Sequence, residues 1–224
     1  ASDGASGDYF GYSVSISGDT IAAGAPRWDH HSGITNCGKV YIYTRDTAGS
    51  LTSGWSELQA CHQNSYLTGG AYYQSSYDYF GWSVAVDGDT LVIGVYGDDD
   101  TASNAGAVYI WAKGASNAGI PGPSQGYDWS YRAKLTASDG AAGDFFGQTV
   151  AVDGDTVVIG AIYDDDNGTS SGSVYVFKHS KTWVQVGNDI DGEAAYDYSG
   201  GLIEGRKVCM SDNGLRVAIG AESH

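Results

Sequence analysis

Two runs of aspartate are the residues of this sequence that best suit metal chemistry. Asp98-Asp99-Asp100 and Asp164-Asp165-Asp166 each stand in a segment rich in Gly, Asn, Ser and Thr. Ca²⁺ takes hard oxygen ligands from carboxylates, carbonyls and water, and three adjacent carboxylates can supply several of them. The alternative is a solvated turn in which Asp and Asn cap backbone amides locally. We expect Ca²⁺ in at least one run, because three adjacent Asp exceed what a turn needs.

Other reactive side chains form weaker patterns. The segment 168–172 matches the Gly-x-Ser-x-Gly motif of hydrolases, but that motif needs a strand-to-helix elbow and no helical period surrounds it. Asp29-His30-His31 carries imidazoles that suit Zn or Cu, yet no further ligand repeats elsewhere. We therefore predict no catalytic residue and no enzymatic activity.

Two kinds of covalent modification are suggested by the sequence, N-glycosylation and disulfide formation. Asn167-Gly168-Thr169 is an acceptor sequon for N-glycosylation, and its alternative is a plain polar turn. Cys37 and Cys61 flank one strand pair. They could form a disulfide or remain two free thiols, and the sequence does not decide between these alternatives. Cys209 lies in a predicted strand and is expected to be a small buried residue.

The amino-acid composition limits the classes of partner that the chain can bind. The 224 residues include 11 Lys and Arg against 27 Asp and Glu, giving a net charge of -16. This excludes nucleic acid, because phosphate neutralisation needs clustered cations. The apolar runs are too short to cross a bilayer. Because the sequence does not begin with Met, we interpret it as a piece of a longer protein.

A repeat underlies these loops. Phe-Gly recurs at Phe10-Gly11, Phe80-Gly81 and Phe146-Gly147, with a degenerate copy at Ser199-Gly200. Each copy continues into two apolar runs, and the second run contains Gly24, Gly94, Gly160 or Gly220. In the first three copies only a Gly-Asp pair separates the two runs, as a two-residue hairpin requires. Self-similarity of this kind indicates a repeat architecture.

Each full copy predicts four strands. The third strand alternates apolar and polar residues, as in 39–43, and the fourth begins at Trp55, Trp129 or Trp183. Four antiparallel strands per repeat make one blade of a β-propeller. We predict an all-β propeller segment of three blades and half of a fourth, an incomplete ring. The blade boundaries are predicted at 1–62, 63–137, 138–187 and 188–224.

The loops after the second and fourth strands leave an up-and-down blade on the same face. The aspartate runs lie in the former loops. The latter carry further acidic residues: Asp3, Asp8, Asp78, Asp139, Asp144, Asp189, Asp191, Glu193 and Asp197. The sequence thus predicts one strongly acidic face.

Aromatic residues divide into two groups. Those that alternate through the third strands are expected to fill the space between blades: Tyr41, Tyr43, Tyr109, Trp111, Tyr175 and Phe177. Tyr72, Tyr73 and Tyr77 lie in a loop and are predicted to contact a partner or a glycan.

Phe10-Gly11 with Gly24-Ala25-Pro26 is the pattern that names the FG-GAP repeat. The chain resembles the FG-GAP repeats of integrin α-subunit propellers and of secreted microbial and algal proteins. The resemblance implies an extracellular binding or adhesive scaffold that often carries Ca²⁺. The integrin-type calcium loop joins the first two strands of a blade. It does not carry over here, because the Gly-Asp turns are too short to wrap an ion.

We therefore expect a secreted or cell-surface, non-enzymatic module that binds a protein, matrix or glycan partner through its acidic face, directly or with Ca²⁺. Further blades or subunits of the same assembly are additional partners. The alternatives are an accessory propeller of a secreted or surface hydrolase and a lectin-like carbohydrate-binding propeller.

Overall fold

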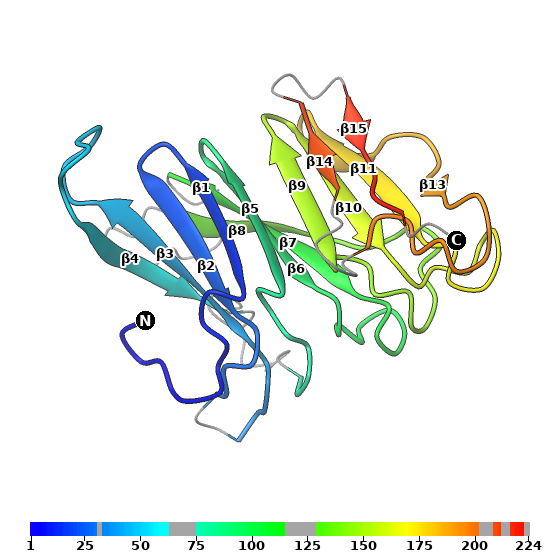
Figure 1. Ribbon diagram of the computed structural model, residues 1–224, viewed down its shortest axis with the longest axis horizontal. Coiled ribbons are helices and arrows are strands. Elements are labelled where there is room, and N and C mark those ends of the chain that lie inside the picture. Colours follow the sequence, from blue (N-terminus) through cyan, green and yellow to red (C-terminus); the bar gives the residue numbers. More distant parts are fainter. Residues whose placement is uncertain (31–32, 63–74, 115–128, 202–207, 212–215, 222–224) are drawn as a thin grey trace.

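The computed structural model describes residues 1–30, 33–62, 75–114, 129–201, 208–211 and 216–221, which fold into consecutive antiparallel sheets (Figure 1). The first sheet comprises β1 (Ser13–Ser17), β2 (Thr20–Ala25), β3 (Lys39–Arg45) and β4 (Trp55–Cys61). The second comprises β5 (Ser83–Asp87), β6 (Thr90–Val95), β7 (Ala107–Lys113) and β8 (Trp129–Leu135).

The third sheet contains β9 (Thr149–Asp153), β10 (Thr156–Ala161), β11 (Ser173–His179), β12 (Trp183–Gln185) and β13 (Ile190–Asp191). The fourth is the pair β14 (Cys209–Met210) and β15 (Val217–Ala218). In each of the first three sheets the main path follows chain order, so the prediction of four-stranded antiparallel blades is confirmed. The sheets stand side by side as an arc, and the described residues do not close a ring (Figure 1).

The hairpins between the first two strands of each sheet are as tight as predicted. Gly18, Gly88 and Gly154 have φ values of 54°, 50° and 56°, which glycine adopts without the steric cost other residues incur. Ser17 pairs directly with Thr20 across the first of these turns. These turns leave no loop in which an ion could be wrapped.

The third sheet departs from the predicted pattern at its outer edge. Its fourth strand is interrupted after Gln185, and the short strand β13 then pairs with the start of β11, bringing Asp191 opposite Ser173. Gly187 lies in the interruption with φ of 72°. As a result, residues 190–191, which were expected to lie in a loop, are paired with β11, and the carboxylate of Asp191 lies at the edge of this sheet.

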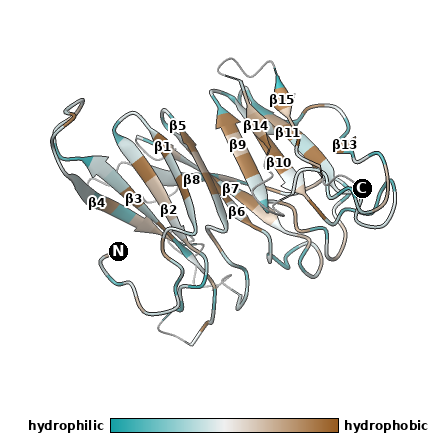
Figure 2. Ribbon diagram, in the orientation of Figure 1, coloured by the Kyte–Doolittle hydropathy of each residue, from teal (hydrophilic) through white to brown (hydrophobic). Residues whose placement is uncertain are grey.

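Apolar side chains of neighbouring sheets pack on one another, and the hydrophobic residues concentrate along the strands (Figure 2). Leu91, Ile93 and Trp111 of the second sheet pack with Ile42 of the first, and Ile159 of the third packs with residues of the second. The third-strand aromatics are buried as predicted, except that Tyr43 is half-buried. A rigid stack of sheets therefore positions the loops at its ends.

Candidate metal-binding site and loop face

Five carboxylates gather at one end of the third sheet. The Tyr175 hydroxyl, on β11, lies 2.9 Å from both Asp139 Oδ1 and Asp164 Oδ2 and shares its single hydrogen between them. Asp139 precedes the sheet and Asp164 follows its second strand, so the two kinds of loop do meet on one face. Burial raises the pKa of the Tyr175 phenol, which keeps it a donor.

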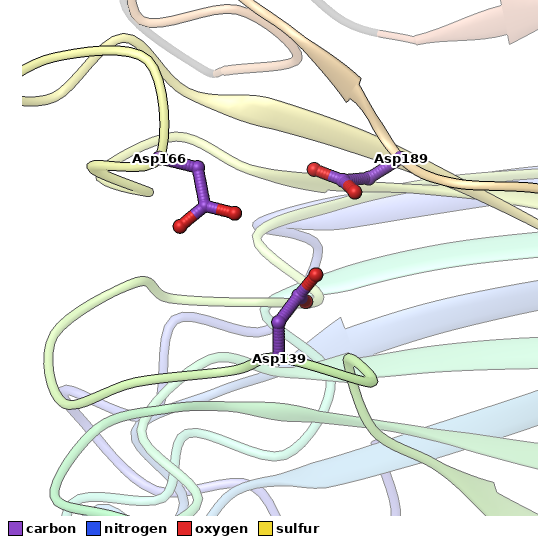
Figure 3. Close-up of side chains that lie close together, drawn as sticks. All are labelled: Asp139, Asp166 and Asp189. Atoms are coloured by element: carbon purple, nitrogen blue, oxygen red, sulfur yellow. The ribbon is translucent and has the colours of Figure 1, made fainter.

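Three loops contribute to this carboxylate cluster, which consists of Asp139, Asp164, Asp166, Asp189 and Asp191. Carboxylate oxygens of Asp139, Asp166 and Asp189 lie within 4.8 Å of one another and point toward a common space (Figure 3). Those of Asp164, Asp166 and Asp191 form a second set within the same limit. Because Ca²⁺ binds oxygen at 2.3–2.6 Å, ligand oxygens on one ion stand up to about 5 Å apart. Each set of three therefore has the spacing that one such ion needs, and the two sets share Asp166.

The cluster is electrostatically strained without a cation. Coulombic repulsion from Asp164 raises the pKa of Asp166, and burial together with Asp191 raises the pKa of Asp189 to about 6. Asp189 Oδ2 is buried and has no hydrogen-bond donor in the described structure. Within those residues, no lysine or arginine pairs with any of the five carboxylates. An orphaned buried oxygen among repelling carboxylates is chemically suited to a hard cation.

The aspartate run of the second sheet already has a positively charged partner. Lys134 Nζ on β8 lies 2.7 Å from Asp98 Oδ2 and 2.6 Å from Asp100 Oδ2. Tyr109 on β7 donates a further hydrogen bond to Asp98. The ammonium stands where a metal would need to bind, so the predicted Ca²⁺ site at Asp98 to Asp100 does not fit this arrangement.

In the first sheet a different lysine, Lys39, provides the counter-charge for the loop carboxylate. Lys39 Nζ forms an ion pair with Asp3, which also accepts a hydrogen bond from the Tyr41 hydroxyl. Burial alone would raise the pKa of Asp3, but the hydrogen bonds from Lys39 and Tyr41 and the ammonium charge outweigh it and lower that pKa. Trp28 stands here at the repeat position of Asp98 and Asp164, and its ring lies under the Lys39 ammonium.

Sequence position explains why the third sheet lacks a counter-charge. Ser173 opens β11 where Lys39 opens β3, and its hydroxyl donates to Asp191. Ile190 pairs with Val174 as Leu135 pairs with Val108, so the residue before it, Asp189, takes the place of Lys134. The third sheet therefore has a lysine at neither position, whereas each of the other two sheets has one. Counting from the tryptophans alone would place Asn188 there, because the count misses the interruption after Gln185.

The middle residue of each aspartate run has the local role that the turn alternative predicted. Asp99 Oδ1 accepts the amide of Asn104, and Asp165 Oδ1 accepts the amide of Ser170, each at 2.6 Å. Asp8, Asp78, Asp144 and Asp197 likewise each accept a backbone amide three residues earlier and are buried. The four buried carboxylates shape the loops and do not add to the exposed acidic surface, whereas Asp99 and Asp165 remain exposed.

A row of aromatic side chains runs across the loop face beside the acidic groups. Neighbouring ring centroids are 4.5 to 6.3 Å apart along Tyr9, Tyr12, Trp82, Tyr79, Tyr96, Phe145, Tyr163 and Tyr198. The residue before each Phe-Gly, or its counterpart in the degenerate copy, is in the left-handed region: Tyr9, Tyr79, Phe145 and Tyr198. A bulky residue adopts that backbone only at a steric cost. The sequence reasoning missed this row, although an aromatic before each copy was its signal.

The pattern of strands, turns and interlocked Phe-Gly segments matches a known family. The FG-GAP repeat matches residues 1–43, 71–111 and 129–177, together more than half of the chain. The chain belongs to the FG-GAP repeat family. A search of curated proteins found no match. FG-GAP repeats are typical of extracellular and surface proteins and of propeller-type binding or scaffold modules. In the described part of this FG-GAP chain no helix is long and apolar enough to span a membrane.

Of the residues predicted to contact a partner, Tyr72 and Tyr73 lie outside the described residues. Tyr77 is exposed, has φ of 72°, and its ring lies 6.3 Å from that of Tyr79 in the aromatic row. Asn167 is exposed, and its side-chain amide donates to the Gly192 carbonyl at 2.7 Å, so the sequon also ties two loops together. Its glycosylation stays a prediction.

Of the two alternatives for Cys37 and Cys61, the structure has the free thiols and not the disulfide. Cys61 packs between the first and second sheets, whereas Cys37 packs with Trp28 and Tyr41 in a separate core cluster. The Cys37 thiol donates to the Trp28 carbonyl. Cys209 lies in β14 as expected but is exposed.

Proposed function

We propose that this FG-GAP segment is a non-enzymatic, extracellular binding scaffold whose loop face holds one Ca²⁺ at the third blade. The observation that carries the proposal is the carboxylate cluster, which has no lysine or arginine partner among the described residues and has Ser173 and Asp189 where the other two blades have Lys39 and Lys134. Asp139, Asp164, Asp166, Asp189 and Asp191 would be the protein ligands. A bound Ca²⁺ would fix three loops that come from different parts of the chain.

Partner recognition would use the surface around that ion. The acidic cluster supplies charge, and the adjoining aromatic row supplies large, partly exposed rings at fixed positions on rigid strand ends. Aromatic side chains are enriched where proteins bind one another, because they offer much contact area at little entropic cost. A net charge of -16 favours a partner with a basic or neutral contact surface. An adhesive or scaffold role follows from these features.

Replacing one cluster carboxylate tests the calcium site against a matched position. The melting temperature of the unmodified protein should rise by about 1–6 °C when about 1 mM Ca²⁺ replaces EDTA, given the affinity of extracellular calcium modules and the length of the chain. Asp166→Asn should lose most of this rise. Asp100→Asn, at the same repeat position in the second blade, should retain it. Equal rises in both variants, or none in the unmodified protein, would count against the site.

The cluster should also make stability depend on pH. Because the folded pKa of Asp189 is raised to about 6 from 3.8, the folded state binds this proton more tightly than the unfolded chain. Its contribution to stability is therefore present below the unfolded pKa and is lost as the pH rises toward 6. In EDTA, Asp189→Asn should raise the melting temperature more at pH 7 than at pH 4.

Differential scanning fluorimetry across this pH range measures the effect, with Glu193→Gln as a control for removing a nearby exposed charge. The Ca²⁺-induced rise should in turn be larger at pH 7 than at pH 5, because protons compete with the ion for the same oxygens. A Ca²⁺ effect that is independent of pH contradicts this assignment.

A further inference from the structure

Two histidines from separate parts of the first sheet lie next to each other on the loop face. His30 lies in the loop after β2, and His62 directly follows β4. Their imidazole centroids are 5.8 Å apart. The Asp-His-His segment has no further ligand nearby in sequence, and the fold supplies one from the end of the fourth strand. Both histidines are half-buried, so the surrounding structure holds them while solvent still reaches them.

The hydrogen bonds of the loop show which residue of the third sheet matches His30. Asp29 and Asp165 each accept a backbone amide from further along their loop, at 2.7 and 2.6 Å. These two aspartates therefore occupy the same repeat position. His30 and Asp166 are the residues that follow them, so His30 stands where the third sheet has a carboxylate of its cluster.

The strand pairing gives the match for His62. Cys61 pairs with the second residue of β3, and Ile190 pairs with the second residue of β11. These two residues are therefore equivalent as well. His62 and Asp191 follow them directly, so His62 stands at the position of a second cluster carboxylate.

One carboxylate set of the third sheet thus has a complete counterpart in the first, in which Asp164, Asp166 and Asp191 are replaced by Trp28, His30 and His62. The Trp28 ring contacts both imidazoles, with centroids 5.7 Å from that of His30 and 5.9 Å from that of His62. The repeat keeps the positions of the ligand residues and changes their chemistry from carboxylate to imidazole.

This change alters which ions the position suits. Imidazole nitrogen binds Zn²⁺, Cu²⁺ and Ni²⁺, whereas Ca²⁺ prefers oxygen. Because Zn²⁺ binds imidazole nitrogen at about 2.0–2.1 Å, two imidazoles on one tetrahedral ion have centroids about 5–6 Å apart. The separation of His30 and His62 lies in this range. Among the described residues no third His, Cys, Asp or Glu lies close enough to complete a group with them.

Charged groups beside the histidines are compatible with a bound cation. The Lys39 ammonium lies 4.4 Å from the centroid of Trp28, but its ion pair with Asp3 offsets its charge. Asp29, next to His30 in the chain, contributes a negative charge that favours a cation.

We propose that His30 and His62 bind one divalent transition-metal ion of the kind that imidazole prefers, with Zn²⁺ as its representative. The ion joins the loop after β2 to the end of β4. Its remaining coordination positions take water or a side chain of a partner. The site does not depend on Ca²⁺ binding at the third blade, because the two sites share no residue.

Isothermal titration calorimetry of the full chain with zinc chloride tests the proposal. The unmodified protein should bind Zn²⁺, and His30→Ala and His62→Phe should each weaken that binding about tenfold or more, since even indirect partners of a metal ligand contribute 10–100-fold. The phenylalanine keeps a ring against Trp28 but has no nitrogen. His179→Ala should bind like the unmodified protein, because it removes an exposed histidine that also contacts a tryptophan ring, 5.1 Å away. Circular dichroism checks that each variant is folded.

A further variant separates this site from the carboxylate cluster. Asp166→Asn should leave Zn²⁺ binding unchanged, and His62→Phe should leave the Ca²⁺-induced rise in melting temperature unchanged. Zn²⁺ binding that is lost in Asp166→Asn but kept in His30→Ala would assign the ion to the cluster and overturn the proposal. Undiminished binding in either histidine variant, or no binding by the unmodified protein, would overturn it as well. Failure of the calcium site alone changes none of these outcomes.

Discussion

Phe146→Ala is expected to lower the free energy of unfolding by about 3–5 kcal/mol, the usual cost of removing a large buried aromatic side chain. Phe146 is 0% exposed and lies among residues of both the second and third sheets. Its ring meets those of Tyr175 and Phe177 edge-on, with centroids 5.2 and 6.1 Å away. The substitution therefore opens a cavity between two blades and removes two aromatic contacts.

Phe10→Ala is the matched control, because the same repeat position is exposed there. Phe10 also meets Tyr41 and Tyr43 edge-on but fills no space between two sheets, so its removal should cost only about 0.5–1.5 kcal/mol. Urea unfolding followed by tryptophan fluorescence compares the two through their midpoints. Similar losses for both variants would mean that the Phe-Gly motif acts locally and does not join one blade to the next.

Lys134→Met is expected to cost about 3 kcal/mol, because it leaves a buried carboxylate without its counter-charge. The Asp98 side chain is 3% exposed, and both of its oxygens accept hydrogen bonds from Lys134 Nζ. The methionine preserves most of the side-chain volume, so the loss reports charge and not packing. Adding Asp98→Asn to this variant should recover much of the stability, since the uncompensated charge is then removed.

Lys178→Met provides the comparison for this prediction. Lys178 lies 3.6 Å from Asp155, and both side chains are more than half exposed. Exposed pairs of this kind contribute about 0–1 kcal/mol. If the two lysine variants lose equal stability in chemical denaturation, Lys134 does not neutralise a buried site, and the contrast between the second and third blades loses its basis.

The blades were predictable from the sequence because their signals are local. A Gly-Asp pair between two apolar runs specifies a hairpin, and alternation in the third strands specifies which side chains are buried. The strand bounds of the first three sheets follow these signals closely. The outer edge of the third sheet could not be predicted from local signals. Its strand β13 forms because Ile190 and Asp191 pair with β11, and not because of any strand propensity of its own.

The site was only half predictable, for a physical reason. Asp98 and Asp164 occupy the same repeat position, and each is followed by two further aspartates. The two residues differ because the ammonium of Lys134, which lies 36 residues further along the chain on another strand, contacts Asp98. Asp139 and Asp191 likewise reach Asp164 only through the fold. Counting carboxylates along one loop identifies neither the counter-charge nor the additional ligands.

The central claim is that the absence of a lysine makes the third blade a calcium site, and isothermal titration calorimetry with Ca²⁺ tests it most directly. The unmodified chain should bind one ion at the affinity of extracellular calcium modules, with a dissociation constant of about 10⁻⁴–10⁻³ M. Ser173→Lys, which restores the residue found at Lys39 in the first sheet, should abolish that binding while the protein stays folded. Undiminished binding by Ser173→Lys, or no binding by the unmodified chain, would contradict the account.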